Sequence, residues 1–427
     1  MNFIEELRWR GMIQGITPGA PEKIGAGGCV GYAGFDPTAP SLHIGHLIPV
    51  MLLVHFQRAG NRPIALVGGA TGMIGDPSGK SEERNLLPVE TIRHNEERLR
   101  AQLEKFLDFS GPCAAEIVNN YDWFAEVRFL DFLRDTGKHL TVNYMAAKDS
   151  VKGRWENGIS FTEFSYQLLQ AYDFLWLYTK KKCVLQMGGS DQWGNITSGA
   201  ELIRRAAGGE AHALTCPLLT RADGGKFGKS EGGENVWLDP AMTSPYKFHQ
   251  YWLNCADADA PKLLRMFTLL PQDEIANIEA EHARAPHERC MQKALARDLT
   301  CRVHSEGEYR SALDASEILF GEAVTESLRR LPEKDFLAMF EGVPQAGIAK
   351  SLLEKGIPVV ELAADRAKLF ASRGEAKRMI QQGGLSVNKV KIMDPNAVIT
   401  LAQVLNGKYL LLQKGRKSYC VVMVGGV

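Results

Sequence analysis

The sequence predicts an α/β fold: a Rossmann-like, doubly wound parallel-sheet domain, followed by a helical domain and a small α+β domain. Two observations support this fold class. Apolar runs of strand length alternate with helical stretches over the first 220 residues, a pattern typical of parallel sheets. The chain has 427 residues, more than one ordinary hydrophobic core accommodates, so two or three domains are expected. We place their limits at residues 1–239, 240–345 and 356–427.

The composition is that of a soluble globular protein, with 45% hydrophobic and 23% charged residues. The formal net charge is zero, so any contact with nucleic acid must come from a local basic patch. The N-terminus carries acidic residues early, and the sequence has no run of about 18 apolar residues. We therefore expect a cytoplasmic protein that makes no contact with a membrane.

The eight cysteines are scattered, and the closest pair is Cys290 and Cys301. The sequence contains no CxxC motif and no Cys/His cluster at zinc spacing. This pattern predicts free thiols in a reducing compartment, rather than disulfides or a metal site.

The first motif follows a strand predicted over Cys29–Phe35. A Pro-rich turn comes next, and a helix is predicted from about Leu42. His43 and His46 lie in the first turn of that helix, where backbone N–H groups and the helix dipole favour an anion. Gly45 has no side chain, so a flat ring such as a purine could lie against the backbone there. By itself, the motif also fits two surface histidines on a capped helix.

A second strand is predicted over Pro63–Gly68, because this apolar run fits a strand that is buried on both faces. It leads into a glycine-rich loop that ends at Lys80 and contains one carboxylate, Asp76. Such a loop can approach a ligand closely. The alternative is that Asp76 caps a turn, which is the commoner role of an aspartate in a loop.

Two further stretches carry no assigned chemistry. Residues 1–18 are predicted to form one amphipathic helix that packs on the domain. Residues 85–150 have helical periodicity, clearest over 90–107, and fit an insertion between the two halves of a nucleotide-binding sheet.

A buried helix is predicted to begin at Ser160, because Ser160 to Glu163 has the S-x-x-E form of a capping box. Tyr166, Gln170 and Asp173 fall on one stripe of this helix, among apolar neighbours. Each would need a polar partner, because an unpaired buried group costs roughly 1–3 kcal/mol. A bound polar ligand would supply those partners; an internal hydrogen-bond network or a solvated edge is the alternative.

A third strand is predicted over Lys182–Met187, and the turn after it carries Asp191 and Gln192. Ligands of open α/β sheets bind at the carboxyl ends of the strands. Asp191 suits a pair of ribose hydroxyls, and Gln192 suits a substrate carbonyl. A last strand over Ala211–Thr220 precedes Lys226–Ser230, where two lysines and a hydroxyl on a Gly-rich turn suit a triphosphate.

The segments His43–His46 and Lys226–Ser230 together resemble the two signature motifs of class I aminoacyl-tRNA synthetases. Residues Gly34–Thr38 and Gly188–Asn195 are similar to those of bacterial-type tyrosyl-tRNA synthetases, and the resemblance spans nearly the whole chain. It implies that L-tyrosine and ATP give tyrosyl-adenylate and pyrophosphate, and that the tyrosyl group then passes to the 3′ end of tRNA(Tyr). It also implies a homodimer, with a dimerisation segment inserted at about residues 110–155.

The resemblance also implies a role for each site residue. Tyr32 and Asp173 would bracket the phenol hydroxyl. The remaining tyrosine contacts would be Asp76, Tyr166, Gln170 and Gln192. The ATP contacts would be Gly34, Asp36, His43, Gly45, His46, Gly189, Asp191 and Lys229. The catalytic set would be His43, His46, Lys80, Arg84, Lys226, Lys229 and Ser230. ATP would be a substrate accompanied by Mg²⁺, with no tightly bound cofactor and no metal ligand from the protein.

The C-terminal module is basic, since residues 373–417 contain nine Lys or Arg and two Asp or Glu. It resembles the small RNA-binding domain named after a ribosomal small-subunit protein, which implies RNA contacts from Arg373, Lys377 and Arg378. A basic surface suits a phosphate backbone. A plainly solvated charged face is the alternative.

Three other interpretations are weighed against this one. A tryptophanyl-tRNA synthetase would share the fold, but Tyr32 and Asp173 suit a phenol. An RNA-binding protein on an inactive synthetase scaffold would be expected to have lost the lysines and histidines of the two motifs. A small-molecule adenylyltransferase would not need the basic C-terminal module.

Overall fold

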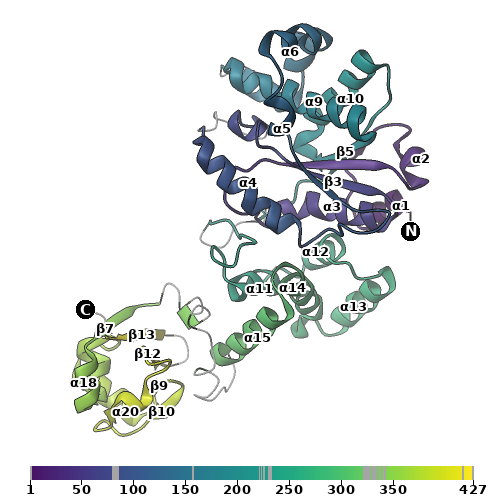
Figure 1. The fold of residues 1–427 in the computed structure, drawn as a ribbon. Helices are drawn as coiled ribbons and strands as arrows, with labels where there is room; N and C mark the ends of the chain where they lie inside the picture. Colours follow the sequence, from purple (N-terminus) through teal and green to yellow (C-terminus); the bar gives the residue numbers. More distant parts are fainter. Residues whose placement is uncertain are drawn as a thin grey trace. The chain divides into compact units, whose positions relative to one another are not determined.

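The computed structural model describes residues 2–425 except 79–85, 156–157, 221, 223, 225–226, 229–232, 321–327, 329–332, 334–335, 338–339, 341–342 and 416–417. Contacts divide the chain into two compact units (Figure 1). The first unit comprises Met1–Thr243 and Tyr251–Val303, and the second comprises Ser244–Gln250 and His304–Val427. The three domain ranges expected from the sequence stay a prediction.

A six-stranded sheet forms the centre of the first unit, in the order β1-β6-β5-β2-β3-β4. Its strands are β1 (Gly15–Ile16), β2 (Val30–Phe35), β3 (Arg62–Val67), β4 (Glu116–Asn119), β5 (Cys183–Gly189) and β6 (His212–Cys216). β1 pairs antiparallel with β6, and all other neighbours are parallel. The chain proceeds from β2 towards one edge and from β5 towards the other. The carboxyl ends of β2 and β5 therefore flank the switch point, where open α/β sheets bind ligands.

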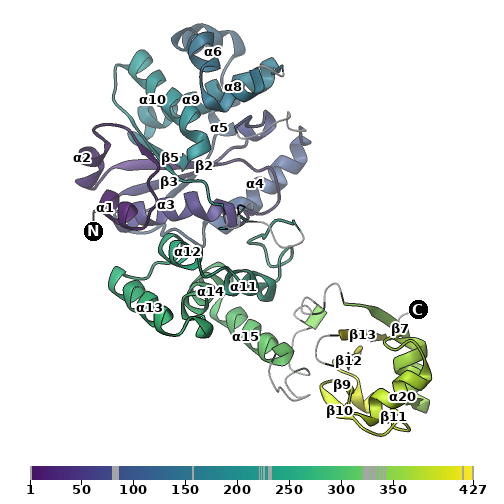
Figure 2. The ribbon, with the colours of Figure 1, turned by 180° about the vertical axis from the view of Figure 1, so that it is seen from behind.

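Helices cover both faces of this sheet, which explains why β3 is buried from Pro63 to Val67 and β6 over its whole length. Helix α3 (Leu47–Arg58) packs on one face, and α9 (Phe161–Lys181) and α10 (Trp193–Ala207) pack together on the other (Figures 1 and 2). Helix α4 (Val89–Leu103) lies between β3 and β4 in the chain. The doubly wound parallel sheet predicted from the sequence is confirmed.

Two local predictions have different outcomes. The strand predicted over Cys29–Phe35 is present as β2. The single helix predicted over residues 1–18 is wrong, because α1 spans only Phe3–Trp9. The chain leaves the helix at Gly11, whose φ of 71° suits glycine, and residues 15–16 instead add an edge strand to β6.

The insertion after β4 consists of short helices: α5 (Tyr121–Phe124), α6 (Phe129–Asp135), α7 (Val142–Ala146) and α8 (Asp149–Trp155). After the sheet, the first unit continues with α12 (Ala260–Phe267), α13 (Gln272–Arg284) and α14 (Cys290–Val303). Helix α11 (Pro245–Leu253) has residues in both units, and α15 (Glu306–Phe320) belongs to the second. Among the described residues, no helix is both long and apolar enough to cross a membrane.

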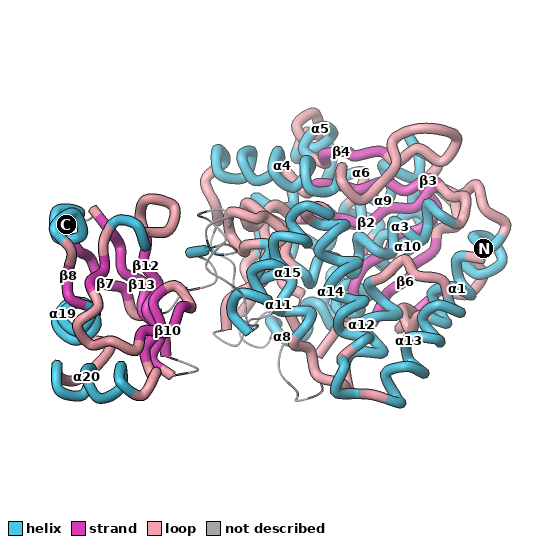
Figure 3. Tube along the Cα trace, turned by 90° about the horizontal axis from the view of Figure 1, so that it is seen from below, coloured by secondary structure: helices cyan, strands magenta, loops and turns pink. Residues whose placement is uncertain are grey.

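The second unit contains a small α+β module, as the sequence predicts (Figure 3). Its five-stranded sheet has the order β10-β9-β12-β13-β7. The strands are β7 (Gln345–Ile348), β9 (Leu385–Val387), β10 (Val390–Ile392), β12 (Tyr409–Lys414) and β13 (Ser418–Val424). A pair of short strands, β8 (Ile357–Pro358) and β11 (Val398–Ile399), lies apart from this sheet, and the helices include α18 (Lys350–Lys355), α19 (Val359–Glu361) and α20 (Arg373–Gln381).

Candidate active site

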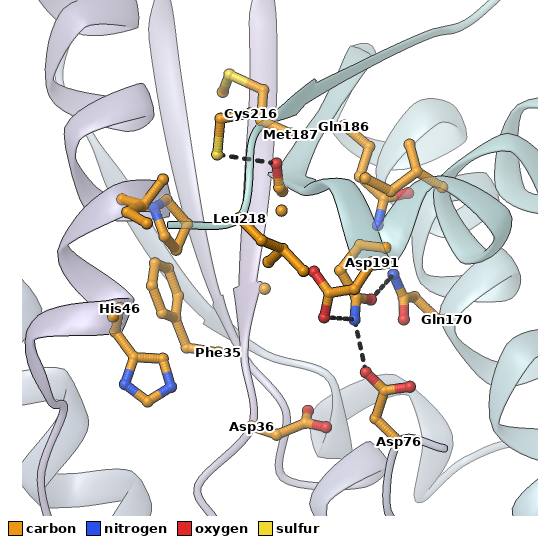
Figure 4. Close-up of a pocket in the computed structure, with 18 of the residues that line it drawn as sticks. Phe35, Asp36, His46, Asp76, Gln170, Gln186, Met187, Asp191, Cys216 and Leu218 are labelled. Atoms are coloured by element: carbon orange, nitrogen blue, oxygen red, sulfur yellow. Dashed lines mark hydrogen bonds between the residues drawn. The ribbon is translucent and has the colours of Figure 1, made fainter. Parts of the chain in front are cut away.

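A cavity of about 550 Å³ lies at the carboxyl ends of β2, β5 and β6. Figure 4 shows Phe35 and His46 on one side of it, and Gln170, Asp191 and Asp76 on the other. The predicted site residues that line it are Tyr32, Gly34, Asp36, His43, Gly45, His46, Asp76, Tyr166, Gln170, Asp173, Gly189, Asp191 and Gln192. The predicted phosphate contacts Lys80, Arg84, Lys226, Lys229 and Ser230 lie outside the described residues.

The deep end of the cavity contains a buried carboxyl group, that of Asp173, which is 2% exposed. Its oxygens accept hydrogen bonds from Asn120 Nδ2 at 3.0 Å and from Trp123 Nε1 at 2.9 Å. Burial raises the pKa of Asp173 to about 8, although both hydrogen bonds act in the opposite direction. A ligand group that donates a hydrogen bond would favour the charged carboxylate.

Tyr32 lies on β2 at the same end and is 1% exposed. Its hydroxyl has no hydrogen-bond partner among the described residues. Burial, and secondarily the charge of Asp173, raises the pKa of Tyr32 well above its usual value, so the hydroxyl keeps its proton. A buried hydroxyl without a partner is costly, and a polar ligand in the cavity would supply one.

The middle of the cavity is polar. Tyr166 donates its hydroxyl proton to Asp36 Oδ2 at 2.7 Å, and Thr71 Oγ1 donates to Asp36 Oδ1 at 2.8 Å. Asp76 accepts hydrogen bonds from Ser78 N at 2.9 Å and from Gln192 Nε2 at 2.7 Å. Asp76 therefore acts as a local turn cap and also presents its second oxygen to the cavity (Figure 4).

The first motif contributes two histidines to the cavity, and backbone N–H groups bond to the Nδ1 atom of each ring. Nδ1 of His43 accepts from Gly45 N at 3.1 Å, and Nδ1 of His46 accepts from His43 N at 3.1 Å. Because an acceptor nitrogen carries no proton, each ring in its neutral form carries its proton on Nε2. A Cβ atom on Gly45 would lie 2.8 Å from His43 Cε1, so a side chain at this position would displace the His43 ring. The motif thus places the Nε2–H groups of His43 and His46 beside a glycine backbone that carries no side chain.

Asn120 and Trp123 were not predicted as site residues, although they contact Asp173 directly. They follow β4, a strand that was not predicted because residues 85–150 have mainly helical periodicity. The sequence signal that could have identified them is two hydrogen-bonding side chains, three residues apart, directly after a strand. Gln186 on β5 was also missed; it is buried, lines the cavity, and its Oε1 has no partner among the described residues.

Two family models match this chain. Residues 28–321 match class I tRNA synthetases (W and Y). Residues 335–422 match the tyrosine–tRNA ligase SYY-like C-terminal domain. Together, the two matches cover both compact units.

Full-length relatives and solved structures agree with these models. The chain is 59% identical to a tyrosine–tRNA ligase of Bacteroides thetaiotaomicron, over 99% of this chain and 100% of the relative. It is 60% identical to the one of Cytophaga hutchinsonii, over 98% of each. A C-terminally truncated mitochondrial tyrosyl-tRNA synthetase of Aspergillus nidulans is 30% identical, with a TM-score of 0.68 over 75% of this chain and 94% of that one.

A tryptophanyl-tRNA synthetase of Encephalitozoon cuniculi shares the fold at 13% identity and a TM-score of 0.51, over 78% of this chain and 90% of that one. In contrast, both full-length relatives are named as tyrosine–tRNA ligases. With its catalytic-domain and C-terminal matches and its full-length identity of about 59%, this chain belongs to the tyrosine–tRNA ligase family of class I aminoacyl-tRNA synthetases.

Proposed function

We propose that this chain ligates L-tyrosine to tRNA(Tyr) in two steps. The carboxylate of tyrosine attacks the α-phosphorus of ATP, forms the acyl–phosphate bond of tyrosyl-adenylate and expels pyrophosphate. A ribose hydroxyl at the 3′ end of tRNA(Tyr) then attacks the acyl carbon, and AMP leaves. The observation that carries this proposal is the Tyr32 hydroxyl, which finds no partner in the described part of the chain and lines the same cavity as Asp173 and both histidines.

Selection of tyrosine over phenylalanine follows from the deep end of the cavity. Tyr32 keeps its proton and would donate to the phenol oxygen, while the phenol proton would go to Asp173. A ligand without the hydroxyl would give the Tyr32 hydroxyl no acceptor and Asp173 no further donor, and a site built to bind a hydroxyl rejects such an analogue strongly. The substrate ammonium would lie against Asp76, Tyr166 and Gln170.

Catalysis in this proposal depends on positioning and charge, because the substrate supplies its own nucleophile. The Nε2–H groups of His43 and His46 would donate to the nucleotide, and Asp191 would bind its ribose. The charge on the departing pyrophosphate would be met by Lys80, Arg84, Lys226, Lys229 and Ser230, which remain sequence predictions. The described residues hold no group of three or more His, Cys, Asp or Glu side chains suited to a metal. Mg²⁺ bound to the phosphates of ATP would add further neutralisation.

Exposed apolar side chains on and beside the insertion support a homodimer. Phe129 and Leu130 on α6, Val142 on α7 and Phe161 at the start of α9 are each more than half exposed. These residues lie within or beside the predicted dimerisation segment, about 110–155. Exposed aromatic and aliphatic side chains in such number are typical of an interface. We propose that a second copy of the chain covers them.

RNA binding would come from α20 in the second unit. This helix buries Ala376 and Ile380 and exposes Lys377 and Arg378, as a phosphate-contacting helix should. Arg373 is also exposed, but its Nε donates to Asp365 at 2.7 Å, so part of its charge is already neutralised. We expect Lys377 and Arg378 to contribute more than Arg373. A cytoplasmic location likewise stays a prediction.

ATP–pyrophosphate exchange with each of the twenty amino acids tests the proposal. Exchange with tyrosine alone supports it. Exchange with tryptophan would indicate the rival synthetase, and exchange with no amino acid would indicate an inactive scaffold that binds RNA.

A further inference from the structure

Three polar side chains on one stripe of α4 bond to the loop that leads into the first motif. Asn95 Nδ2 donates to Pro37 O at 2.9 Å, and Arg98 Nε donates to Pro40 O at 3.1 Å. Gln102 Oε1 accepts from Leu42 N at 2.8 Å. Positions 95, 98 and 102 follow the i, i+3, i+7 spacing of a single helix face. The helix thus holds the backbone of the loop directly before His43.

Gln102 is the most constrained of the three. It is buried, and its Nε2 donates to Ser41 Oγ at 3.1 Å while Oε1 serves Leu42 N. Ser41 Oγ in turn donates to Leu42 O at 2.7 Å and accepts from Asp239 N at 3.1 Å. A hydroxyl has one donor and two acceptor positions, so all the hydrogen-bonding positions of Ser41 Oγ are occupied.

This network also joins the loop to the segment 236–239. Leu238 N donates to Leu42 O at 2.8 Å, and Ile44 N donates to Val236 O at 3.0 Å. The rings of Trp237 and His43 pack in a T-shaped arrangement, with centroids 5.9 Å apart. Val236 N donates to Gly228 O at 3.1 Å, inside the second motif. The described parts of both motifs therefore share one buried junction.

We propose that Gln102 is a positioning residue for adenylate formation. Gln102 is not one of the described residues that line the cavity, so it acts through the loop it holds. By fixing Ser41 and Leu42, it sets where the Nε2–H groups of His43 and His46 point. This inference rests on the proposed nucleotide contacts of those histidines. A small displacement of such donors slows the chemical step more than it weakens tyrosine binding.

The test compares Gln102→Met with a matched control, Gln57→Met. Gln57 on α3 also uses both ends of its amide to hold a loop, since it donates to Asp108 O and Cys113 O and accepts from Asp108 N. Both variants lose a loop-holding amide, but only Gln102 contacts the loop of the first motif. Single-turnover formation of tyrosyl-adenylate and equilibrium binding of tyrosine are measured for each, together with the melting temperature.

We expect Gln102→Met to slow adenylate formation by about 10- to 100-fold with tyrosine affinity unchanged, and Gln57→Met to react at the wild-type rate. Should Gln102→Met fail to fold, Ser41→Ala removes the same junction and should give the same separation of rate from affinity. In a His46→Ala background, Gln102→Met should have much less effect than in the wild type, because both act on one contact.

Equal rates for Gln102→Met and Gln57→Met, with His46→Ala slow, would overturn the inference alone. A wild-type rate for His46→Ala would overturn the proposed role of the first motif, and the inference with it.

Discussion

Trp123 donates its indole N–H to Asp173 at 2.9 Å; both side chains are buried, and Asp173 lines the cavity. Asn120 donates to the other carboxylate oxygen. The two bonds fix the plane of the carboxyl group and leave acceptor positions for a further donor, such as a phenol. Recognition of tyrosine would then depend on an acceptor that the protein has already oriented.

Replacing Asp173 by Asn should impair tyrosine recognition selectively. The variant exchanges a carboxylate acceptor for an amide that also carries a donor, in a pocket where Asn120 and Trp123 already donate. Loss of a charge-assisted hydrogen bond worth about 1.5–3 kcal/mol lowers kcat/KM for tyrosine by roughly 10- to 100-fold. Pyrophosphate exchange at varied tyrosine and at varied ATP measures both effects. An unchanged tyrosine KM and rate would exclude Asp173 from recognition.

Tyr32→Phe should stabilise the free protein and weaken tyrosine binding at the same time. The Tyr32 hydroxyl is buried without a partner among the described residues, so its removal relieves a penalty of about 1–3 kcal/mol. Urea unfolding without ligand measures the first effect, and the tyrosine KM in exchange measures the second. Lower stability together with an unchanged KM would show that the hydroxyl has another partner.

Stability should fall in mild acid because of His55. This residue lies on α3, is 1% exposed, and burial lowers its pKa to about 3, with smaller contributions from Arg10, Arg58 and Arg302. Above pH 6.5 the ring is neutral in both states and contributes nothing. Below pH 6.5 the unfolded chain binds a proton that the folded chain does not, so stability is lost as pH falls.

Between pH 7 and pH 5 the loss from His55 should reach roughly 2 kcal/mol. Urea unfolding at the two pH values measures it, and His55→Met should show a smaller difference than the wild type. The same pH dependence in both proteins would mean that other groups cause it.

Leu130→Asp should convert a dimer into monomers, because it places a charge on the most exposed of the large apolar side chains on α6. Analytical ultracentrifugation measures the mass directly. Val390→Asp makes the same change at an exposed apolar residue of β10 in the second unit and should leave the dimer intact. A monomeric wild type, or dimers from Leu130→Asp, would contradict the proposed interface.

Much of the cavity followed from the sequence because its residues obey local rules. Strand ends carry Asp36, Asp191 and Gln192, and a helical stripe carries Tyr166, Gln170 and Asp173. The cap at Ser160 was also predictable, and its Oγ accepts from Glu163 N at 3.1 Å.

What the sequence could not reveal depends on contacts between distant segments. Asn120 and Trp123 contact Asp173 from 50 or more residues away. In the sequence, Asn95, Arg98 and Gln102 look like an ordinary polar face of a helix. Its role becomes visible only when the loop at 37–42 is seen against it.

A crystal structure with a non-hydrolysable tyrosyl-adenylate analogue tests the central claim most directly. The phenol oxygen should lie within about 3 Å of both Tyr32 Oη and Asp173, with the adenine against Gly45 and the ribose bound by Asp191. A phenol ring that lies elsewhere, with Tyr32 still unpartnered, would contradict it.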